Sequence, residues 1–124
     1  MSQREIYPEL LKDLPLSEST FLILVSLDDK PKHGYAIMKE VQSLSQGRVT
    51  LSTGTLYGAI KRMLKDNWIR RVELVDEEED ARQRKFYALT NRGRRVLGAE
   101  TARLRELVEI AGRRLALGAQ SGGD

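Results

Sequence analysis

Apolar residues recur at helical spacing in four segments, and this pattern predicts four main helices. The segments are 17–27, 33–46, 52–66 and 91–117. The first is apolar nearly all round, which is typical of a buried helix, while the second and third each carry one apolar stripe at spacings of three and four residues. Ser17 and Ser52 stand where helix N-caps are expected, and Asn67 falls where a helix end needs a left-handed residue.

Two segments between the third and fourth helices have the composition of β-strands. Residues 68–75 alternate apolar and charged positions, and residues 85–89 are rich in strand-forming residues. The charged stretch between them would form the tip of a hairpin. Because two short strands bury little surface alone, the hairpin must pack against the helices. The order of elements predicts a mainly α fold with a β-hairpin, namely a winged helix-turn-helix followed by a C-terminal helix.

The composition is that of a small globular protein. The chain has 124 residues, of which 40% are hydrophobic and 31% charged, and its length suits one domain with an additional helix. It has no cysteine and one histidine, which excludes disulfides, thiolate chemistry and most zinc sites. The longest apolar run, 21–25, is far shorter than the roughly 20 residues of a membrane span. Since the N-terminus also lacks a signal-peptide pattern, we expect a cytosolic protein without a membrane partner, a metal or another cofactor.

Positive charge is concentrated in the middle of the chain. Between Arg48 and Arg95 there are twelve basic and seven acidic residues, and five of the acidic ones form a single run, 76–80. Outside that run the region is basic, as expected of a surface that binds phosphates. A solvated arginine-rich surface would have the same composition, so charge alone leaves both interpretations open.

Three short motifs follow one another in the predicted winged helix. They are His33-Gly34-Tyr35, Ser52-Thr53-Gly54-Thr55-Leu56-Tyr57 and, after the hairpin, Lys85-Phe86-Tyr87-Ala88-Leu89-Thr90-Asn91-Arg92-Gly93. Together, at these spacings, they resemble the PadR family of transcriptional regulators over residues 17–117. The resemblance implies a homodimeric winged-helix repressor that binds a pseudo-palindromic operator on double-stranded DNA. In many members a small molecule releases the protein from DNA, and the length and single C-terminal helix look like the short PadR subfamily.

The first motif has a physical interpretation of its own. Gly34 would allow a close backbone approach where the second predicted helix meets its neighbours. His33 fits a helix terminus or the surface better than a DNA contact.

The third predicted helix is the candidate recognition helix. Short side chains in its first turn would let its N-terminus enter the major groove. Tyr57 can donate its hydroxyl to a phosphate and Lys61 can supply charge, although Tyr57 could instead close the edge of the core. The predicted wing adds basic residues, whereas the run 76–80 would repel DNA if it faced the duplex. The candidate DNA-binding residues are Ser52, Thr53, Gly54, Tyr57, Lys61, Arg82, Arg84 and Lys85.

The last predicted helix carries a heptad seam. The seam residues, which include the candidate dimer contacts, follow a pattern of alternating steps of four and three residues along the helix. A second apolar stripe is formed by Leu107, Ile110 and Leu117. One stripe would pack on the chain's own core, and the other is left for a partner, as the family's dimer implies. The helix has no aromatic residue, which argues against a stacking pocket for a planar effector and leaves any effector unidentified. The candidate dimer contacts are Leu97, Leu104, Val108, Ala111 and Leu115.

The favoured function is that of a dimeric DNA-binding transcriptional regulator, most simply a repressor. The alternative is a winged-helix protein-interaction module without sequence-specific DNA binding, which the basic residues of the third helix and wing disfavour. An enzyme is disfavoured because one histidine without cysteine gives no credible nucleophile–base pair. The predicted parts are an N-terminal helical arm (1–16), a winged helix-turn-helix (17–90), a C-terminal dimerisation helix (91–118) and a disordered tail (119–124).

Overall fold

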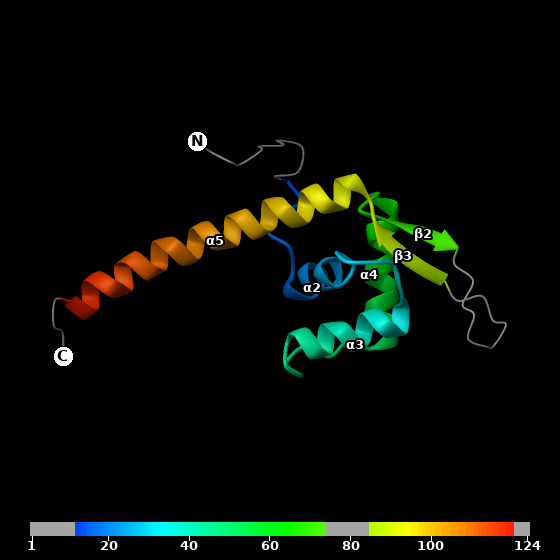
Figure 1. The fold of residues 1–124 in the computed structure, drawn as a ribbon, viewed down its shortest axis with the longest axis horizontal. Helices are drawn as coiled ribbons and strands as arrows, with labels where there is room; N and C mark the ends of the chain where they lie inside the picture. Colours follow the sequence, from blue (N-terminus) through cyan, green and yellow to red (C-terminus); the bar gives the residue numbers. More distant parts are fainter. Residues whose placement is uncertain (1–11, 74–84, 121–124) are drawn as a thin grey trace.

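The computed structural model describes residues 12–73 and 85–120, the last four of these as backbone only. Its elements are α2 (Glu18–Ser26), β1 (Lys32–His33), α3 (Gly34–Leu44), α4 (Thr53–Lys65), β2 (Ile69–Glu73), β3 (Lys85–Leu89) and α5 (Asn91–Gln120). Helices α2 to α4 and the sheet form a head at the N-terminal end of α5, and α5 extends well beyond it (Figure 1). The predicted fold class, mainly helical with a small antiparallel sheet, is confirmed. The predicted N-terminal helical arm (1–16) falls largely on residues 1–11, outside the described residues.

The helix starts follow from local capping. The Ser17 hydroxyl accepts a hydrogen bond from the backbone N–H of Thr20 (3.1 Å). In the same way the Ser52 hydroxyl accepts from the N–H of Thr55 (3.1 Å), so both predicted caps are confirmed. His33 caps α3 through its Nδ1 atom, which accepts from the N–H of Ala36 (3.2 Å). Each cap satisfies a backbone donor that the helix itself leaves unpaired.

The sheet has three strands, one more than the sequence predicts. Its order is β1-β3-β2, all antiparallel, with Lys32 opposite Tyr87 and Arg71 also opposite Tyr87. The additional strand β1 is two residues long, too short to show any periodicity in the sequence. It nevertheless attaches the start of α3 to the central strand, so α3 and the wing strands form one unit.

The core lies between the three head helices and the sheet. It takes Ile23 and Leu24 from α2, Ile37 and Val41 from α3, and the predicted stripe of α4. Trp68, Ile69, Tyr87 and Leu89 close it from the sheet side, and Val96 closes it from α5. Buried apolar side chains of this size contribute about 1.5–3 kcal/mol each. The apolar stripes of α3 and α4 are therefore the faces that the pattern predicts, except that Leu44 is exposed at the end of α3.

The end of α4 is joined tightly to the start of α5. Asn67 has a left-handed backbone (φ 62°), as predicted. Its carbonyl oxygen accepts from the Thr90 hydroxyl (2.6 Å), and the Trp68 carbonyl accepts from the Thr90 N–H (3.0 Å). The Thr90 hydroxyl in turn accepts from the Gly93 N–H (2.9 Å). A Cβ atom at Gly93 would overlap the Trp68 carbonyl oxygen, so only glycine fits this contact.

Two buried charged side chains connect other segments. The Lys32 ammonium donates to the carbonyl of Ser26 at the end of α2 (2.6 Å) and lies beside the carboxylates of Asp29 and Glu40. Glu100 of α5 accepts from the backbone N–H of Leu16 (3.0 Å). The Arg103 guanidinium is hydrogen-bonded to Glu100 (2.7 Å) and lowers the pKa of this carboxyl group below its ordinary value, against the effect of burial.

In the described part of the chain, no helix is both long enough and apolar enough to cross a bilayer.

Candidate nucleic-acid interface

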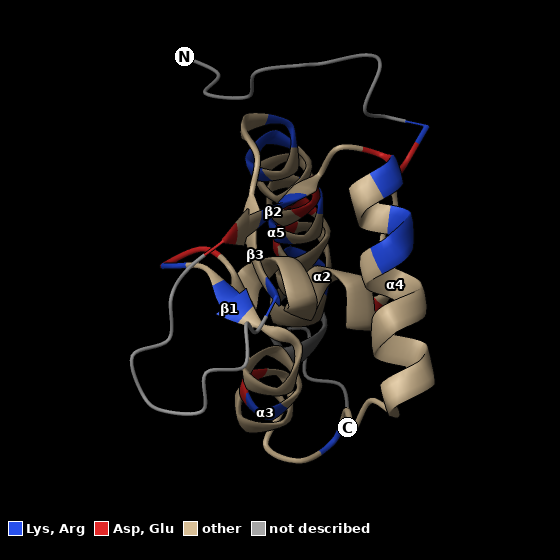
Figure 2. Ribbon diagram, turned by 90° about the vertical axis from the view of Figure 1, so that its right-hand side faces the viewer, with Lys and Arg blue, Asp and Glu red and all other residues tan. Residues whose placement is uncertain are grey.

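Helix α4 presents a polar face opposite its core stripe. Leu56, Ala59, Ile60 and Met63 are buried. The five residues predicted on its outer side are all exposed: Ser52, Thr53, Gly54, Tyr57 and Lys61. Basic residues follow one another along the C-terminal half of the helix (Figure 2), where Lys61 is followed by Arg62 and Lys65. The structure therefore brings the predicted recognition-helix residues together on one accessible surface.

Two of the sequence motifs touch each other in the fold. The phenol of Tyr57 lies directly over Gly34, the first residue of α3. A Cβ atom added to Gly34 would overlap the Tyr57 hydroxyl and lie 2.8 Å from Cζ. The predicted close approach at Gly34 is confirmed, and the neighbour that needs it is the ring of Tyr57. Although it packs there, Tyr57 is still 46% exposed, so its position at the edge of the core leaves it open to a ligand.

Strand β2 adds a basic residue that the sequence analysis missed. Arg71 is exposed and lies opposite Tyr87, whose side chain is buried. Burial raises the pKa of the Tyr87 phenol, the nearby Tyr57 raises it further, and the positive charge of Arg71 lowers it. Arg71 therefore lies directly beside Tyr87, and Tyr57 lies near the same residue. The alternation of apolar and charged residues in β2 gives no signal for this, because it assigns Arg71 only to the solvent side of a strand.

The described part of the wing holds one predicted DNA-binding residue. Lys85 is exposed at the start of β3, directly opposite Glu73. Arg82, Arg84 and the acidic run 76–80 lie outside the described residues. Their predicted roles, and the direction in which the acidic run faces, stay predictions.

The residues of helix α5 are partly buried near the head and exposed beyond it. Leu97 packs against the head's core and Leu104 is half-buried. Beyond them every side chain of residues 105–116 is exposed, including Val108 at 69% and Leu115 at 74%. The prediction that one stripe packs on the chain's own core therefore holds for the start of the seam, at Leu97 and Leu104, whereas from residue 105 to residue 116 neither stripe is covered. The helix also continues to Gln120 rather than ending near Leu117.

The described residues hold no group of three or more His, Asp or Glu side chains placed to bind a metal ion.

Three short helices, an antiparallel hairpin behind the third helix, and an exposed polar face on that helix define a winged helix-turn-helix protein. The family model described as "Transcriptional regulator PadR-like family" matches residues 23–99. The chain belongs to this family, and its class is therefore that of transcriptional regulators rather than enzymes. The match covers all three motifs that carried the resemblance in the sequence.

Two solved structures of PadR proteins are similar to this one, with different sequence identities to the chain. A PadR family transcription regulator from Clostridium difficile R20291 has a similar structure, with a TM-score of 0.66, 30% identity, and coverage of 80% of this chain and 99% of that one. The structure of Bacillus subtilis PadR in complex with operator DNA has a TM-score of 0.57 over 68% of this chain and 46% of that one. At 19% identity the second likeness shows the fold alone.

One relative among the curated proteins is much longer. An "Uncharacterized 37.1 kDa protein in transposon TN4556" from Streptomyces fradiae is 38% identical over 84 residues. These residues are 68% of this chain and 22% of the relative, so this chain corresponds to about a fifth of that protein.

Proposed function

We propose that this protein binds double-stranded DNA as a homodimeric repressor in the cytoplasm, with α4 as the recognition helix. The observation that carries the proposal is the exposed face of α4, on which Thr53, Tyr57 and Lys61 lie together opposite a fully buried apolar stripe. A recognition helix needs this division, because one side must be held by the domain and the other must fit a groove.

Each part of the α4 face has a role in this proposal. The first turn, with Ser52, Thr53 and Gly54, is small enough to approach the floor of the major groove. Tyr57 and Lys61 then contact backbone phosphates and fix the position of the helix on the duplex. Lys85, at the start of the wing strand β3, would also contact a backbone phosphate. The predicted basic residues Arg82 and Arg84 would reach adjacent phosphates.

The proposed dimer uses the projecting half of α5. Val108, Ala111 and Leu115 are apolar and exposed on a helix that leaves its own domain. A second copy of the same helix would cover this seam, and Leu104 would lie where the seam meets the head. Two recognition helices would then read the half-sites of a pseudo-palindromic operator. An effector that changed the angle between the protomers would release the dimer from the DNA.

The proposal is tested by recovering genomic DNA fragments that the purified protein retains, and by measuring affinity for one of them by fluorescence anisotropy. Tyr57→Phe and Lys61→Ala should weaken binding without unfolding the protein. Tyr57→Phe keeps the ring that packs over Gly34, and Lys61 is exposed, where a substitution changes stability by only about 0.5 kcal/mol. Lys30→Ala is the matched control, because Lys30 is an exposed lysine before β1, at the sheet edge farthest from β2. Wild-type affinity in both α4 variants would exclude α4 as the recognition helix, and failure to retain any DNA would favour the protein-interaction alternative.

A further inference from the structure

We propose that Arg71 of β2 and Tyr57 of α4 bind one and the same DNA backbone phosphate, which fixes the recognition helix relative to the wing. The inference rests on the proposed DNA-binding function. It adds a residue outside both the recognition helix and the wing tip, on a strand whose remaining role is structural.

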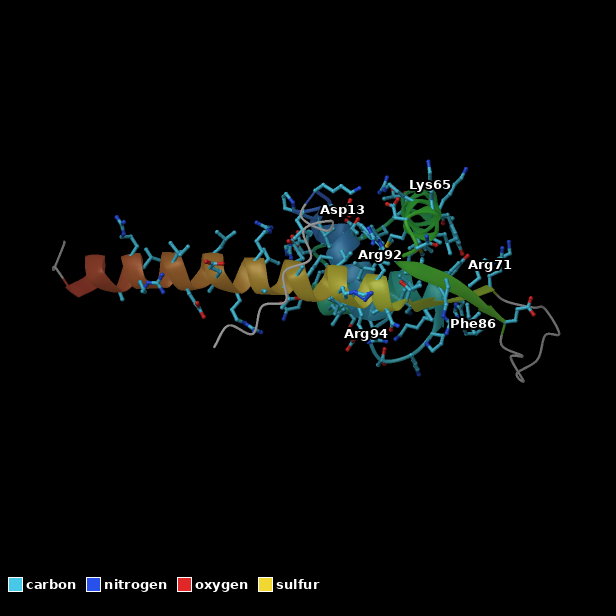
Figure 3. The ribbon with its side chains drawn as sticks, turned by 90° about the horizontal axis from the view of Figure 1, so that it is seen from above. Asp13, Lys65, Arg71, Phe86, Arg92 and Arg94 are labelled. Atoms are coloured by element: carbon cyan, nitrogen blue, oxygen red, sulfur yellow. The ribbon has the colours of Figure 1, made fainter. Side chains whose placement is uncertain are left out.

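The strand geometry places Arg71 on the side of α4. Successive side chains of a strand point to opposite faces, so Arg71 shares a face with Ile69, two residues earlier, which is buried in the core. Its cross-strand neighbour Tyr87 belongs to the same core. Figure 3 shows Arg71 on the same side of the strands as Lys65 of α4, with Phe86 on the other side. Arg71 is thus at the exposed rim of the face that packs against the recognition helix.

The position of Tyr57 makes the shared contact possible. Gly34 has no side chain, and the Tyr57 phenol occupies the space where a Cβ would be. This packing holds the ring beside the start of α3, which directly follows β1. β1 and β2 pair with β3 from opposite sides, and Lys32 and Arg71 both lie opposite Tyr87. A phenol hydroxyl and a guanidinium therefore converge on one exposed region, from two elements that are far apart in the sequence.

The chemistry of the two groups suits a phosphate diester. A guanidinium offers several N–H donors in a planar fork that matches the phosphate oxygens, and a phenol adds one O–H donor. Neither group needs to read a base, so the contact is expected on DNA of any sequence. Such a contact would set how deeply α4 enters the groove, because it is made beside the helix and not at its tip.

Salt-dependent binding to a labelled duplex of arbitrary sequence, about 30 base pairs long, tests the inference between about 50 and 200 mM salt. Arg71→Gln should weaken binding by about tenfold for each protomer bound, and it should make the plot of log affinity against log salt less steep by about 0.9 for each lost contact. The matched control is Arg70→Gln, which removes the same charge from the adjacent residue on the opposite face of β2. The control should keep the slope of the wild-type protein.

A double-mutant cycle tests whether the phosphate is shared. Tyr57→Phe and Arg71→Gln should each weaken binding, and the combined variant should lose less than the sum of the two effects. Gly34→Ala should imitate Tyr57→Phe, because the added methyl group displaces the end of the Tyr57 side chain, and circular dichroism should confirm that each variant is folded.

The outcomes are distinct. Equal effects of Arg70→Gln and Arg71→Gln would mean that only net charge matters, and wild-type behaviour of Arg71→Gln would remove Arg71 from the interface. Strictly additive effects of Tyr57→Phe and Arg71→Gln would place the two residues on different phosphates. Each of these results overturns the inference while leaving the DNA-binding function intact. A wild-type protein that does not bind the duplex at all would instead overturn the proposed function.

Discussion

A single methyl group at Gly93 should separate the start of α5 from the head. In Gly93→Ala the new Cβ would overlap the Trp68 carbonyl oxygen and lie 2.8 Å from the carbonyl carbon. Both groups belong to the backbone, so a side-chain rotation cannot relieve the overlap. The backbone of α5 or of residues 67–68 must move, and three hydrogen bonds depend on that position: Thr90 N–H to Trp68, Thr90 hydroxyl to Asn67, and Gly93 N–H to Thr90.

The expected magnitude follows from these contacts. Net losses of about 0.5–1.5 kcal/mol for each of the three hydrogen bonds give roughly 1.5–4.5 kcal/mol, and forcing extra atoms into a packed position adds about 1–3 kcal/mol. The better helix propensity of alanine returns about 1 kcal/mol. From these contributions we expect Gly93→Ala to lower the free energy of unfolding by about 1.5–6.5 kcal/mol, which is a large fraction of the stability of an ordinary domain.

Gly98→Ala is the control within the same helix. A Cβ at this exposed position would meet no heavy atom of the described residues within 4 Å. It should raise the free energy of unfolding by up to about 1 kcal/mol through helix propensity alone. Urea denaturation followed by circular dichroism measures both variants. A Gly93→Ala protein as stable as wild type, or a change of the same sign in both variants, would refute the account of the α4–α5 junction.

Three further predictions concern other parts of the chain. Lys32→Met should lower the free energy of unfolding by about 1–3 kcal/mol, because the carbonyl of Ser26 loses its buried donor, and urea denaturation measures this loss. Glu100 has a lowered pKa in the folded state, so its carboxylate stabilises the protein above the ordinary pKa near 4.5, and this contribution disappears as the pH falls through the lower folded value. Denaturation midpoints over a pH series should therefore lose that acid-range dependence in Glu100→Gln. Val108→Arg combined with Leu115→Arg should give a folded monomer with weakened DNA binding. Both positions are exposed in the single chain, so the arginines leave its fold intact, but in the dimer they would place unpaired charges in the seam. A dimer of unchanged stability in sedimentation experiments would be contrary to the proposed role of α5.

The features that the sequence predicted well depend on near neighbours. The caps at Ser17 and Ser52 and the left-handed Asn67 are set by residues within one helical turn, and the apolar stripe of α4 by a simple period. Gly34 was recognised as a point of close approach, but the ring of Tyr57 that occupies the space is 23 positions away, and no local pattern names it.

The features that the sequence missed are set by tertiary packing. Strand β1 exists because β3 offers it a backbone edge to pair with, and two residues carry no periodicity. Alternation in β2 placed Arg71 on the solvent side, whereas Ile69 on the same face is buried and only the rim is open. In α5 the heptad pattern is uniform, and the position where the helix leaves the head decides which residues are covered.

In the proposed complex, two copies of this chain place their α4 helices in successive major grooves on one side of a duplex. Hydroxyl-radical footprinting on a retained genomic fragment tests this arrangement most directly. We expect two protected patches on the same face of the DNA, with centres about one helical turn (roughly 34–36 Å) apart, and loss of both patches in Lys61→Ala at moderate salt. A single patch, or two patches that persist unchanged in Lys61→Ala, would contradict it.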